Sequence, residues 1–261
     1  MIPVLGIPHY NRPDLLVRCI ESIDTEVAVL ALVLNGPLDQ FPLAHVAEIG
    51  RHLQGGERYM TRAGGIIHRL ELCQHPNAGC AGAWNEIIKL FPNPGRNLFH
   101  YWLITNNDIA FTPGDLAKLH AAVVGNQGEL LYGNHGASFF AITENCVQRA
   151  GLFDENIHPV YLEDCDYSYR LKLLGLREVT VAGVAAIHGD ATVSGSCTIN
   201  ASPEIKTRNG QTHGGNFAYY RAKWGGENGR EMYVFPFNDP HCPVWAWRFD
   251  PVRRAQQLWP H

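Results

Sequence analysis

The sequence predicts an α/β protein whose central, mostly parallel β-sheet is flanked by helices. Residues 2–7 form an apolar run that ends at Pro8, and the run from Val27 to Leu34 is continuously apolar and rich in valine. Between these runs, residues 14–23 place apolar side chains at a helical period. A strand, a helix and a second strand at the start of a chain are typical of a parallel sheet with crossover helices.

The remaining elements continue this alternation. Glycine pairs in residues 37–70 indicate loops around a weak helix. We expect further helices over residues 79–91, 113–124 and 163–174, and further strands over residues 70–73, 99–105, 138–143 and, as one strand or two short ones, 179–187. The length of 261 residues fits one α/β domain with a short appendage, and 46% hydrophobic with 18% charged residues is typical of a globular protein.

The character of the sequence changes after His188. Residues 189–214 are rich in Gly, Ser, Thr and Asn, which predicts a loop, and the residues beyond them are rich in Trp, Tyr and Phe. We therefore expect a domain over residues 1–200 and an appendage over residues 201–261 that packs on it through aromatic side chains. The appendage has eight Lys and Arg against five Asp and Glu, so an anionic partner would suit this end of the chain.

The cysteine pattern and the hydropathy indicate the cellular compartment of the protein. The seven cysteines are scattered singly and no pair has the C-x-x-C spacing, which argues against a disulfide framework or a zinc knuckle. The N-terminus lacks the basic flank and cleavage site of a signal peptide, and the most apolar run is far shorter than a membrane-spanning helix. We expect a protein without a membrane span in the reducing cytoplasm.

A first group of residues suited to chemistry follows a predicted buried strand. Asn106, Asn107 and Asp108 come directly after the strand that ends at Thr105, and ligand sites of open α/β sheets lie beyond the carboxyl ends of the strands. A carboxylate at this place suits Mn²⁺ or Mg²⁺, which prefer oxygen ligands and bridge carboxylates to a diphosphate. The same three residues also fit a simple turn.

Three carboxylates, those of Glu163, Asp164 and Asp166, lie where a helix is expected to begin. Such a cluster suits a general base, which must reach an acceptor hydroxyl and stay ionised near neutral pH. Acidic residues are also favoured at a helix N-terminus by the helix dipole. In addition, Asp166 and Arg170 have the i,i+4 spacing of an intrahelical ion pair, so a structural role stays open for this residue.

Two further segments are less specific. The run from His75 to Asn85 places small residues in the first turn of a helix, where another group can approach closely, but tight packing of the helix explains the pattern equally well. His188 follows the predicted strand or strand pair, and a neutral imidazole at that position can ligate a metal, although a single histidine is more often structural.

The order of these motifs resembles that of the family 2 glycosyltransferases with the GT-A fold. Residues 8–12, Pro-His-Tyr-Asn-Arg, match the loop after the first strand of that family. Residues 106–108 match its metal motif in the Asn-Asn-Asp form of rhamnosyltransferase-like members. The other matching segments, in the family's order, are residues 77–85, 151–155 and 163–171, followed by His188. The resemblance covers roughly residues 2–195.

The resemblance implies a role for each matched residue. Asp108 would bind the Mn²⁺ or Mg²⁺ ion that bridges the donor diphosphate, with His188 as a second ligand. Asp164 would be the general base that deprotonates the acceptor hydroxyl for an inverting displacement, and Glu163 and Asp166 would orient that loop and the acceptor. The residues expected to line or border the nucleotide pocket are Pro8, Tyr10, Asn11, Arg12, Asn35, Asn77, Gly79, Asn85 and Asn107.

The chain departs from the family pattern at two positions. Many members end the second strand with an Asp, where this chain has Asn35, and many carry two or three carboxylates in the metal motif, where this chain has only Asp108. The base of the nucleotide therefore stays open, although a UDP-sugar is the donor expected first. The metal would depend on His188 and on the donor diphosphate to complete its shell.

The end of the chain, from Tyr219 to Gly226 and on to Asn238, resembles the tail of phage-encoded family 2 transferases. That resemblance implies a hydroxymethylated pyrimidine in phage DNA as the acceptor and the host cytoplasm as the compartment. Basic residues interleaved with aromatic ones could hold a phosphate backbone, and the aromatic ones could stack a base. These basic residues are Arg208, Arg221, Lys223, Arg230, Arg248, Arg253 and Arg254.

Two alternatives stand beside this interpretation of the tail. In the first, the aromatic residues only pack the tail on the body, Arg221 or Lys223 neutralises the donor diphosphate, and the acceptor is a surface polysaccharide or another glycan. In the second, the protein is a non-catalytic module that binds nucleotide sugars, against which the carboxylates of residues 163–166 argue.

Overall fold

The computed structural model describes residues 1–74, 77–91, 101–190, 195–198 and 200–242. The main sheet has the strand order β10-β8-β9-β6-β1-β2-β4-β3, with β5 also paired to β2. Its strands are β1 (Ile2–His9), β2 (Glu26–Leu34), β3 (Tyr59–Met60), β4 (Ile66–Ile67), β5 (Leu70–Gln74), β6 (Tyr101–Thr105), β8 (Leu130–Gly133), β9 (Gly136–Thr143) and β10 (Glu178–Thr180). A separate two-stranded sheet pairs β7 (Ile109–Ala110) with β11 (Ile187–His188).

The centre of the main sheet is parallel, as the sequence predicts. β1 pairs in parallel with β2 and with β6, and β2 pairs in parallel with β5. These central strands are buried because helices cover both faces of the sheet, and this is why their sequences are nearly continuous apolar runs. β9 runs antiparallel to β6 and β8, so the sheet is mixed at that side.

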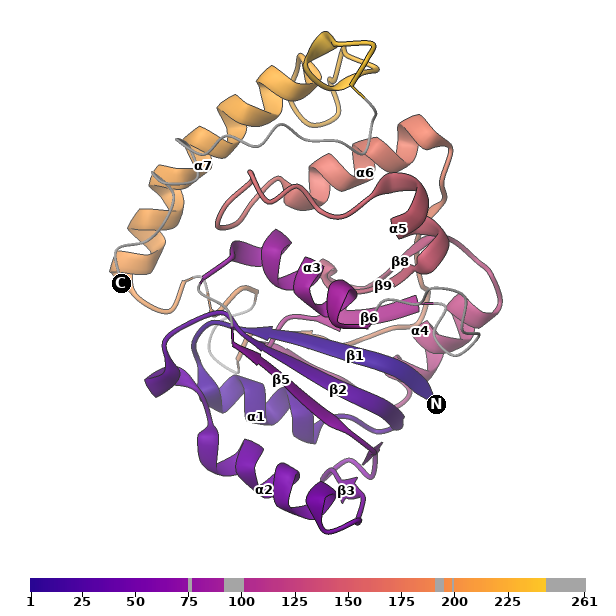
Figure 1. The fold of residues 1–261 in the computed structure, drawn as a ribbon, viewed down its shortest axis with the longest axis vertical. Coiled ribbons are helices and arrows are strands. Elements are labelled where there is room, and N and C mark those ends of the chain that lie inside the picture. The colour runs from indigo at the N-terminus through magenta and orange to yellow at the C-terminus, as the bar shows by residue number, and fades with distance from the viewer. Residues whose placement is uncertain (75–76, 92–100, 191–194, 199, 243–261) are drawn as a thin grey trace.

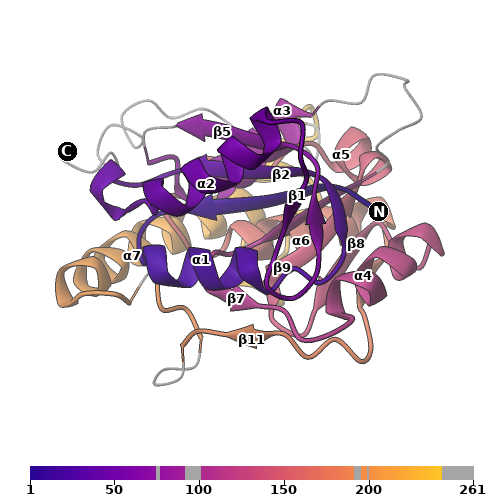
Figure 2. The same ribbon diagram turned by 90° about the horizontal axis from the view of Figure 1, so that it is seen from below.

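Helices form a layer on each face of the main sheet (Figure 1). The helices are α1 (Pro13–Glu21), α2 (Leu43–Gln54), α3 (Gly79–Leu90), α4 (Asp115–Val124), α5 (Glu144–Ala150), α6 (Glu163–Leu174) and α7 (Pro203–Trp224), with two short 3₁₀ turns, η1 (Leu38–Gln40) and η2 (Pro236–Asn238). One core cluster joins α1, α2 and α4 to the sheet, and a second joins α3, α5 and α6 to its other face (Figure 2). The expected sheet flanked by helices is confirmed.

The C-terminal helix α7 corrects the expectation of a loop over residues 189–214. It begins at Pro203, where the hydroxyl of Ser202 caps it by accepting a hydrogen bond from the backbone N–H of Ile205 at 3.2 Å. Gly210, Gly214 and Gly215 lie within the helix, and each costs about 1 kcal/mol of helix propensity. Tertiary packing of its C-terminal half on α6 compensates for this cost, and local composition cannot reveal such packing.

Several smaller elements were also not expected from the sequence, among them β8 and α5 and the two-residue strands β3, β4 and β7. The predicted strand over residues 99–105 is present from Tyr101 onward, and its first two residues lie outside the described part of the chain. No helix in the described part of the chain is both long enough and apolar enough to cross a membrane.

Candidate functional site

A cavity of about 590 Å³ opens at the edge of the sheet where several parallel strands end. Tyr10 follows β1, Asn35 follows β2, Asn77 lies shortly after β5, and Asn106 follows β6. Because the strands run parallel, the residues after their last positions meet at one edge, which is the usual place for ligands in open α/β sheets. The other wall comes from the segment that leads into α6 and from the N-terminal half of α7.

Of the fifteen residues that the sequence analysis assigned to the site, eight line this cavity. They are Pro8, Tyr10, Asn35, Asn77, Gly79, Asn107, Glu163 and Asp164. The other seven are not among the lining residues, and they are Asn11, Arg12, Asn85, Asp108, Asp166, His188 and Lys223.

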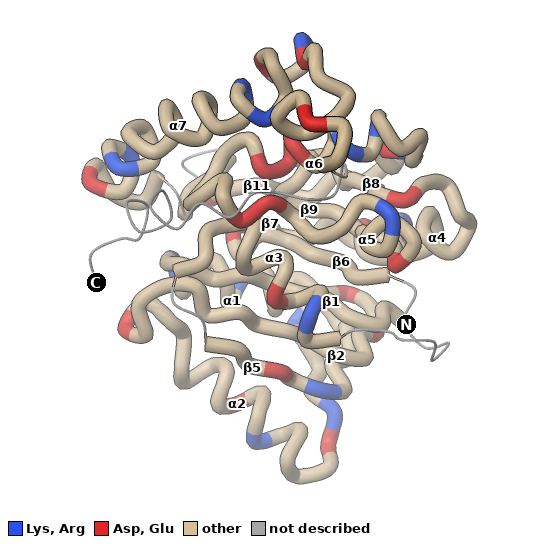
Figure 3. Tube along the Cα trace, turned by 45° about the horizontal axis from the view of Figure 1, so that its top comes forward, with Lys and Arg blue, Asp and Glu red and all other residues tan. Residues whose placement is uncertain are grey.

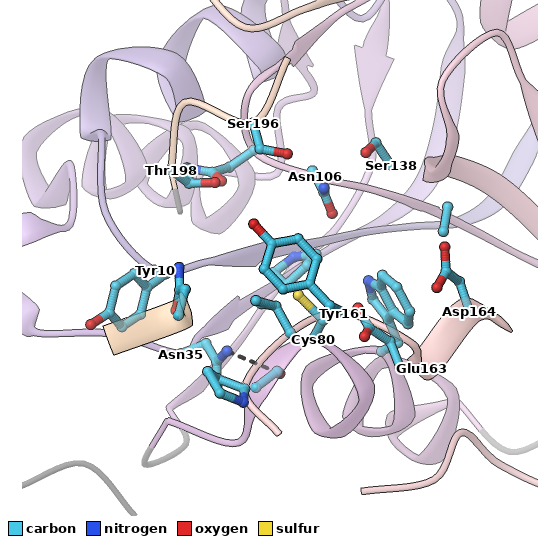
Figure 4. A pocket seen from close by; sticks show the side chains of 18 of the residues that line it. Tyr10, Asn35, Cys80, Asn106, Ser138, Tyr161, Glu163, Asp164, Ser196 and Thr198 are labelled. Atoms are coloured by element: carbon cyan, nitrogen blue, oxygen red, sulfur yellow. Dashed lines mark hydrogen bonds between the residues drawn. The ribbon is translucent and has the colours of Figure 1, made fainter. Parts of the chain in front are cut away.

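The side chains divide the cavity into two ends (Figure 4). Tyr10 and Asn35 lie at one end, Glu163 and Asp164 lie at the other, and Tyr161 stands between them. Tyr161 and Leu162 have positive φ angles of 76° and 81°, a conformation that costs energy for residues with a side chain. Both residues line the cavity, so this backbone conformation is located at the site itself.

Asn35 fastens the start of α3 to the end of β2. Its side chain accepts a hydrogen bond from the backbone N–H of Ala78 at 2.7 Å and donates one to the carbonyl of Gly79 at 3.1 Å. Gly79 has a φ of 69°, and a Cβ atom there would lie 2.6 Å from the carbonyl oxygen of Pro159. Glycine therefore permits the close approach that brings the segment before α6 over the N-terminus of α3.

Glu163 and Asp164 begin α6 and differ in their surroundings. Asp164 is partly exposed in the cavity, where its Oδ1 accepts a hydrogen bond from the backbone N–H of Cys165 at 2.8 Å. Glu163 is only 6% exposed. Burial, and secondly the neighbouring charge of Asp164, raise the pKa of Glu163 to about 8. The Glu163 carboxyl group is therefore mostly neutral near neutral pH.

The two-stranded sheet holds Asp108 and His188 side by side. His188 pairs with Ile109 in the register of β7 and β11, and the backbone N–H of Gly189 donates to the carbonyl of Asp108 at 2.9 Å. Nε2 of His188 lies 3.3 Å from Oδ1 of Asp108. Both atoms are buried and neither has a hydrogen-bond partner within the described chain.

The segment at residues 196–198 lies between Asp108 and the cavity. Oδ2 of Asp108 accepts a hydrogen bond from the backbone N–H of Cys197 at 2.8 Å, and Asp108 has no exposed surface. Ser196 and Thr198, on either side of Cys197, line the cavity instead. A ligand in the cavity would therefore reach the Asp108 carboxylate only after this segment shifts.

Arg18 of α1 supports the same place from behind and was not singled out by the sequence. Its guanidinium donates hydrogen bonds to the backbone carbonyl of Asp108, at 2.9 Å, and to that of Gly189. These two carbonyls belong to chain segments far apart in the sequence, so no local pattern could have indicated the role. Arg18 thus fixes the backbone that carries the Asp108 and His188 pair.

The pair fits a divalent cation with mixed ligands. An oxygen and a nitrogen that are buried, unpaired and 3.3 Å apart offer two ligands of the kinds that Mn²⁺ accepts. No group of three or more His, Cys, Asp or Glu side chains in the described part of the chain is arranged to hold a metal. The remaining ligands would then have to be oxygens of the donor or of water.

Asn11 and Arg12 act through neighbouring chain segments and do not line the cavity. The side-chain amide of Asn11 donates to the carbonyl of Thr198 at 2.9 Å, and Asn107 donates to the carbonyl of Asn11 at 2.7 Å. The guanidinium of Arg12 pairs with Asp190 at 3.1 Å, after β11. The two residues hold Asp190 and Thr198 next to the end of β1.

Asn85 is a completely buried polar residue that fastens a turn to α3. Its amide group donates to the carbonyl of Phe153 at 2.9 Å and accepts from the backbone N–H of the same residue at 2.9 Å. It also donates to Oε1 of Glu155 at 2.9 Å. Its contacts fix the turn at residues 151–155, which precedes the segment that forms the cavity wall.

Asp166 and Lys223 form a buried charge cluster behind the site rather than a part of its lining. Nζ of Lys223 lies 2.6 Å from Oδ1 of Asp166 and 2.7 Å from Oδ2 of Asp154, and all three side chains are fully buried. Asp166 also pairs with Arg170 at 3.0 Å, as its i,i+4 spacing predicted, and accepts a hydrogen bond from the indole of Trp224 at 2.8 Å. Figure 3 shows acidic positions in red on α6 and basic positions in blue on α7, which lies beside it.

Helix α7 contributes a wall of the cavity that the sequence analysis missed. Ile205, Asn209 and His213 line the cavity. They have i, i+4 and i+8 spacing and therefore share one face of the helix. The ring of His213 packs edge-on against the ring of Tyr161, with 5.4 Å between the ring centroids. The spacing of these three residues can be seen in the sequence, but the glycines near them argued against a helix, so they were not expected to share a face.

The comparisons with known proteins rest on structure alone. No protein-family model matches the chain, and no curated protein sequence matches it. Among solved structures, the mannosyltransferase PcManGT from Pyrobaculum calidifontis, in complex with GDP-Man and Mn²⁺, superposes with a TM-score of 0.56 at 14% identity. GalNAc-T7, solved with UDP, GalNAc and Mn²⁺, gives 0.53 at 11% identity, and TarS of S. aureus gives 0.51 at 13% identity.

These matches cover most of this chain but only part of the other proteins. The match with PcManGT covers 84% of this chain and 64% of PcManGT. The match with GalNAc-T7 covers 85% of this chain and 50% of GalNAc-T7, and the match with TarS covers 71% of this chain and 36% of TarS. The chain thus spans less than two thirds of each. The likeness establishes the fold, which is the mixed α/β, GT-A type nucleotide-sugar-binding fold that the motif order implied.

Proposed function

We propose that this protein is a metal-dependent, inverting glycosyltransferase that moves a sugar from a nucleoside-diphosphate sugar to an acceptor hydroxyl. The observation that carries the proposal is the cavity itself. It joins polar residues at the carboxyl ends of parallel strands to the Glu163 and Asp164 carboxyl groups at the start of α6. The GT-A type fold supports it, because solved neighbours with that fold hold GDP-Man or UDP.

The donor would lie along the cavity with its nucleotide at the end formed by Tyr10 and Asn35. A volume of about 590 Å³ is within the range of pockets that enclose ligands of this size. Asn77, Asn106 and Asn107 add polar groups along the same wall. The sugar would then lie toward Asp164, at the other end. We expect UDP first among the nucleotides, with GDP as the alternative.

Asp108 and His188 would hold the divalent cation, Mn²⁺ or Mg²⁺. When bound, such an ion neutralises the negative charge that grows on the leaving diphosphate. Asp108 is the one carboxylate of the Asn106–Asp108 motif, so the donor diphosphate would complete the shell. Binding of metal and donor would be mutually dependent, and both would require the segment at residues 196–198 to move from Asp108.

Asp164 would be the general base. Its carboxylate takes the proton of the acceptor hydroxyl, and the oxygen attacks the anomeric carbon from the face opposite the diphosphate. The bond between that carbon and the phosphate oxygen breaks with its electron pair going to the nucleoside diphosphate, so the configuration inverts. The partial exposure of Asp164 in the cavity suits this role, because an acceptor can reach it.

For the acceptor we keep two classes, a hydroxymethylated pyrimidine in DNA and a glycan. Arg208 lies close enough to Tyr10 for its positive charge to lower the pKa of that phenol, against the larger effect of burial, which places a cation of α7 near the cavity. Lys223, by contrast, forms a buried ion pair with Asp166. Arg248, Arg253 and Arg254 lie outside the described residues. Measuring the affinity for hydroxymethylated duplex DNA at increasing salt concentrations separates the two classes. If DNA is the acceptor, the protein should bind it with an affinity that falls steeply with salt. If the acceptor is a glycan, the protein should not bind the DNA even at low salt.

A thermal-shift screen tests the proposed function. Nucleoside diphosphates and their sugars should raise the melting temperature in the presence of Mn²⁺, because a ligand that binds only the folded state stabilises it in proportion to RT ln(1 + [L]/Kd). Nucleosides without phosphate serve as the control and should give a smaller shift. If no nucleotide raises the melting temperature, the proposal fails. If nucleotides bind but no sugar nucleotide is ever turned over, the protein is a binding module.

A further inference from the structure

Two buried polar atoms of residues that line the cavity lack a hydrogen-bond partner within the described chain. They are Oε2 of Glu163 and Nε1 of Trp84, whose residues are 6% and 2% exposed. Buried polar groups are nearly always paired, and leaving one unpaired costs about 1–3 kcal/mol. Two such atoms in the lining of one cavity therefore indicate a place where a ligand supplies the missing partner.

The neighbours of Glu163 determine what kind of partner it needs. Cys80, Tyr161 and Asp164 face its carboxyl group from α3, from the preceding segment and from α6 itself. The thiol of Cys80 and the backbone of Tyr161 lower the pKa of Glu163, but by less than burial raises it. These contacts leave Oε2 free. With a pKa raised to about 8, mainly by burial, the carboxyl group is protonated near pH 7. A protonated oxygen without a partner is a hydrogen-bond donor.

Trp84 adds a second donor to the lining of the same cavity. Cys80 and Trp84 lie four residues apart on α3, so they share a face of that helix, and Cys80 touches Glu163. An indole nitrogen can only donate. Two donors at this wall of the cavity match an oxygen that accepts both hydrogen bonds, such as a sugar hydroxyl or the carbonyl of an acetamido group.

We propose that the Glu163 carboxyl group and Trp84 donate hydrogen bonds to oxygen atoms of the sugar carried by the donor nucleotide, and so select the donor sugar. This inference rests on the proposed function. Glu163 adjoins Asp164, beside which the anomeric carbon must lie, so its partner belongs to the reacting sugar. Both donors are almost completely buried, which suits the sugar enclosed in the cavity better than an acceptor that arrives from solvent.

The test compares the affinity for a nucleotide with that for its sugar derivative. Melting-temperature titrations with Mg²⁺ use UDP against UDP-GlcNAc and GDP against GDP-mannose, near pH 6.5 and near pH 9, on either side of the pKa of about 8. The variants are Glu163→Gln, Glu163→Leu and Trp84→Phe. Glu57→Gln, at an exposed position outside the cavity lining, is the matched control.

In the wild type, the preference for the sugar nucleotide over the nucleotide should be high near pH 6.5 and should fall by pH 9, where Trp84 alone still donates. Glu163→Leu should lower that preference about tenfold, the size of one lost hydrogen bond, and leave affinity for the nucleotide within about twofold. Trp84→Phe should lower it as well. Glu163→Gln keeps a donor that does not titrate, so its preference should persist at both pH values, and Glu57→Gln should behave as the wild type.

Several results would overturn the inference. One is an unchanged preference in Glu163→Leu. Two further results would overturn it even if Glu163→Leu does not fold. One is a wild-type preference that does not fall by pH 9. The other is a preference of Glu163→Gln that falls between pH 6.5 and pH 9 as much as that of the wild type. A wild type that binds none of the four nucleotides would overturn the proposed function and this inference with it, whereas nucleotide binding with an unaltered sugar preference overturns the inference alone.

Discussion

The ammonium nitrogen of Lys223 in α7 lies 2.6 Å from a carboxylate oxygen of Asp166 in α6, and both side chains are fully buried. Asp154 shares the same ammonium at 2.7 Å. Because α6 begins with Glu163 and Asp164, this cluster couples the C-terminal helix to the helix that carries the proposed base. Lys223 is therefore bound to Asp154 and Asp166 and is not among the residues that line the cavity.

Removing that ammonium should destabilise the protein. Lys223→Met leaves two buried carboxylates without their shared cation, and breaking a buried pair in this way costs about 3–5 kcal/mol. The matched control is Lys206→Met, at an exposed position of the same helix, which should change stability by less than about 0.5 kcal/mol. Urea unfolding of the three proteins measures the difference, and equal stability of the two variants would contradict the structural role.

Asp164→Asn should abolish sugar transfer while the protein keeps its fold and its affinity for nucleotides. The amide cannot take the acceptor proton, and loss of a general base slows such reactions by about 10²–10⁴-fold. Turnover is measured as transfer to the acceptor, and nucleotide binding by melting temperature serves as the folding control. Wild-type turnover in Asp164→Asn would remove this residue from the mechanism.

Asp108→Asn should abolish metal-dependent binding of the donor. The asparagine oxygen can still accept the hydrogen bond of the Cys197 N–H, so the fold is retained, whereas the negative ligand is lost. In the wild type, Mn²⁺ and nucleoside diphosphate should each tighten the other's binding by about tenfold or more, a coupling of roughly 1.4 kcal/mol. Calorimetric titration of one ligand with and without the other measures this coupling, and its persistence in Asp108→Asn would exclude the proposed metal site.

The pH dependence of stability should distinguish the wild type from Glu163→Gln. The Glu163 carboxyl group binds its proton more tightly in the folded state, where its pKa is about 8, than in the unfolded state, where the ordinary value is 4.5. Its contribution to stability is therefore fully present below about pH 4.5 and is lost as pH rises through about 8. The wild type should lose roughly 2–4 kcal/mol relative to Glu163→Gln between these limits.

Denaturant unfolding of both proteins at several pH values between about 5 and 8.5 makes this comparison. Because Glu163 is almost completely buried, solvent screening should reduce the effect little. Parallel stability profiles of the two proteins would show that Glu163 is ionised in the folded protein at neutral pH.

The elements that the sequence predicts are those with a local cause. The apolar runs of β1 and β2 and the helical period of α1 are visible because each element buries a face that its own residues define. Helix α7 has no such face in its first half and carries three glycines, so only its contacts with α6 reveal it. The partners of Lys223 could likewise not be predicted from the sequence, because they lie on other elements and meet Lys223 only in the folded protein.

The candidate site was predictable to a similar extent. Residues at the ends of parallel strands, such as Asn35 and Asn107, and the carboxylates at the start of α6 follow from position in the chain alone. The burial of Asp108 behind residues 196–198, the support from Arg18 and the α7 wall around His213 require contacts between distant segments. Composition and spacing contain no information on those contacts.

The most direct test of the central claim is release of nucleoside diphosphate from a sugar nucleotide. Wild-type protein with Mn²⁺ should release UDP from UDP-GlcNAc or another UDP-sugar, or GDP from GDP-mannose, slowly with water and faster with an acceptor. Chelation of the metal should stop the release, and Asp164→Asn should bind the same nucleotide without releasing it. If nucleotides bind the wild type but no sugar nucleotide is cleaved, or if Asp164→Asn cleaves as fast as the wild type, the account of this protein as a glycosyltransferase acting through this site is contradicted.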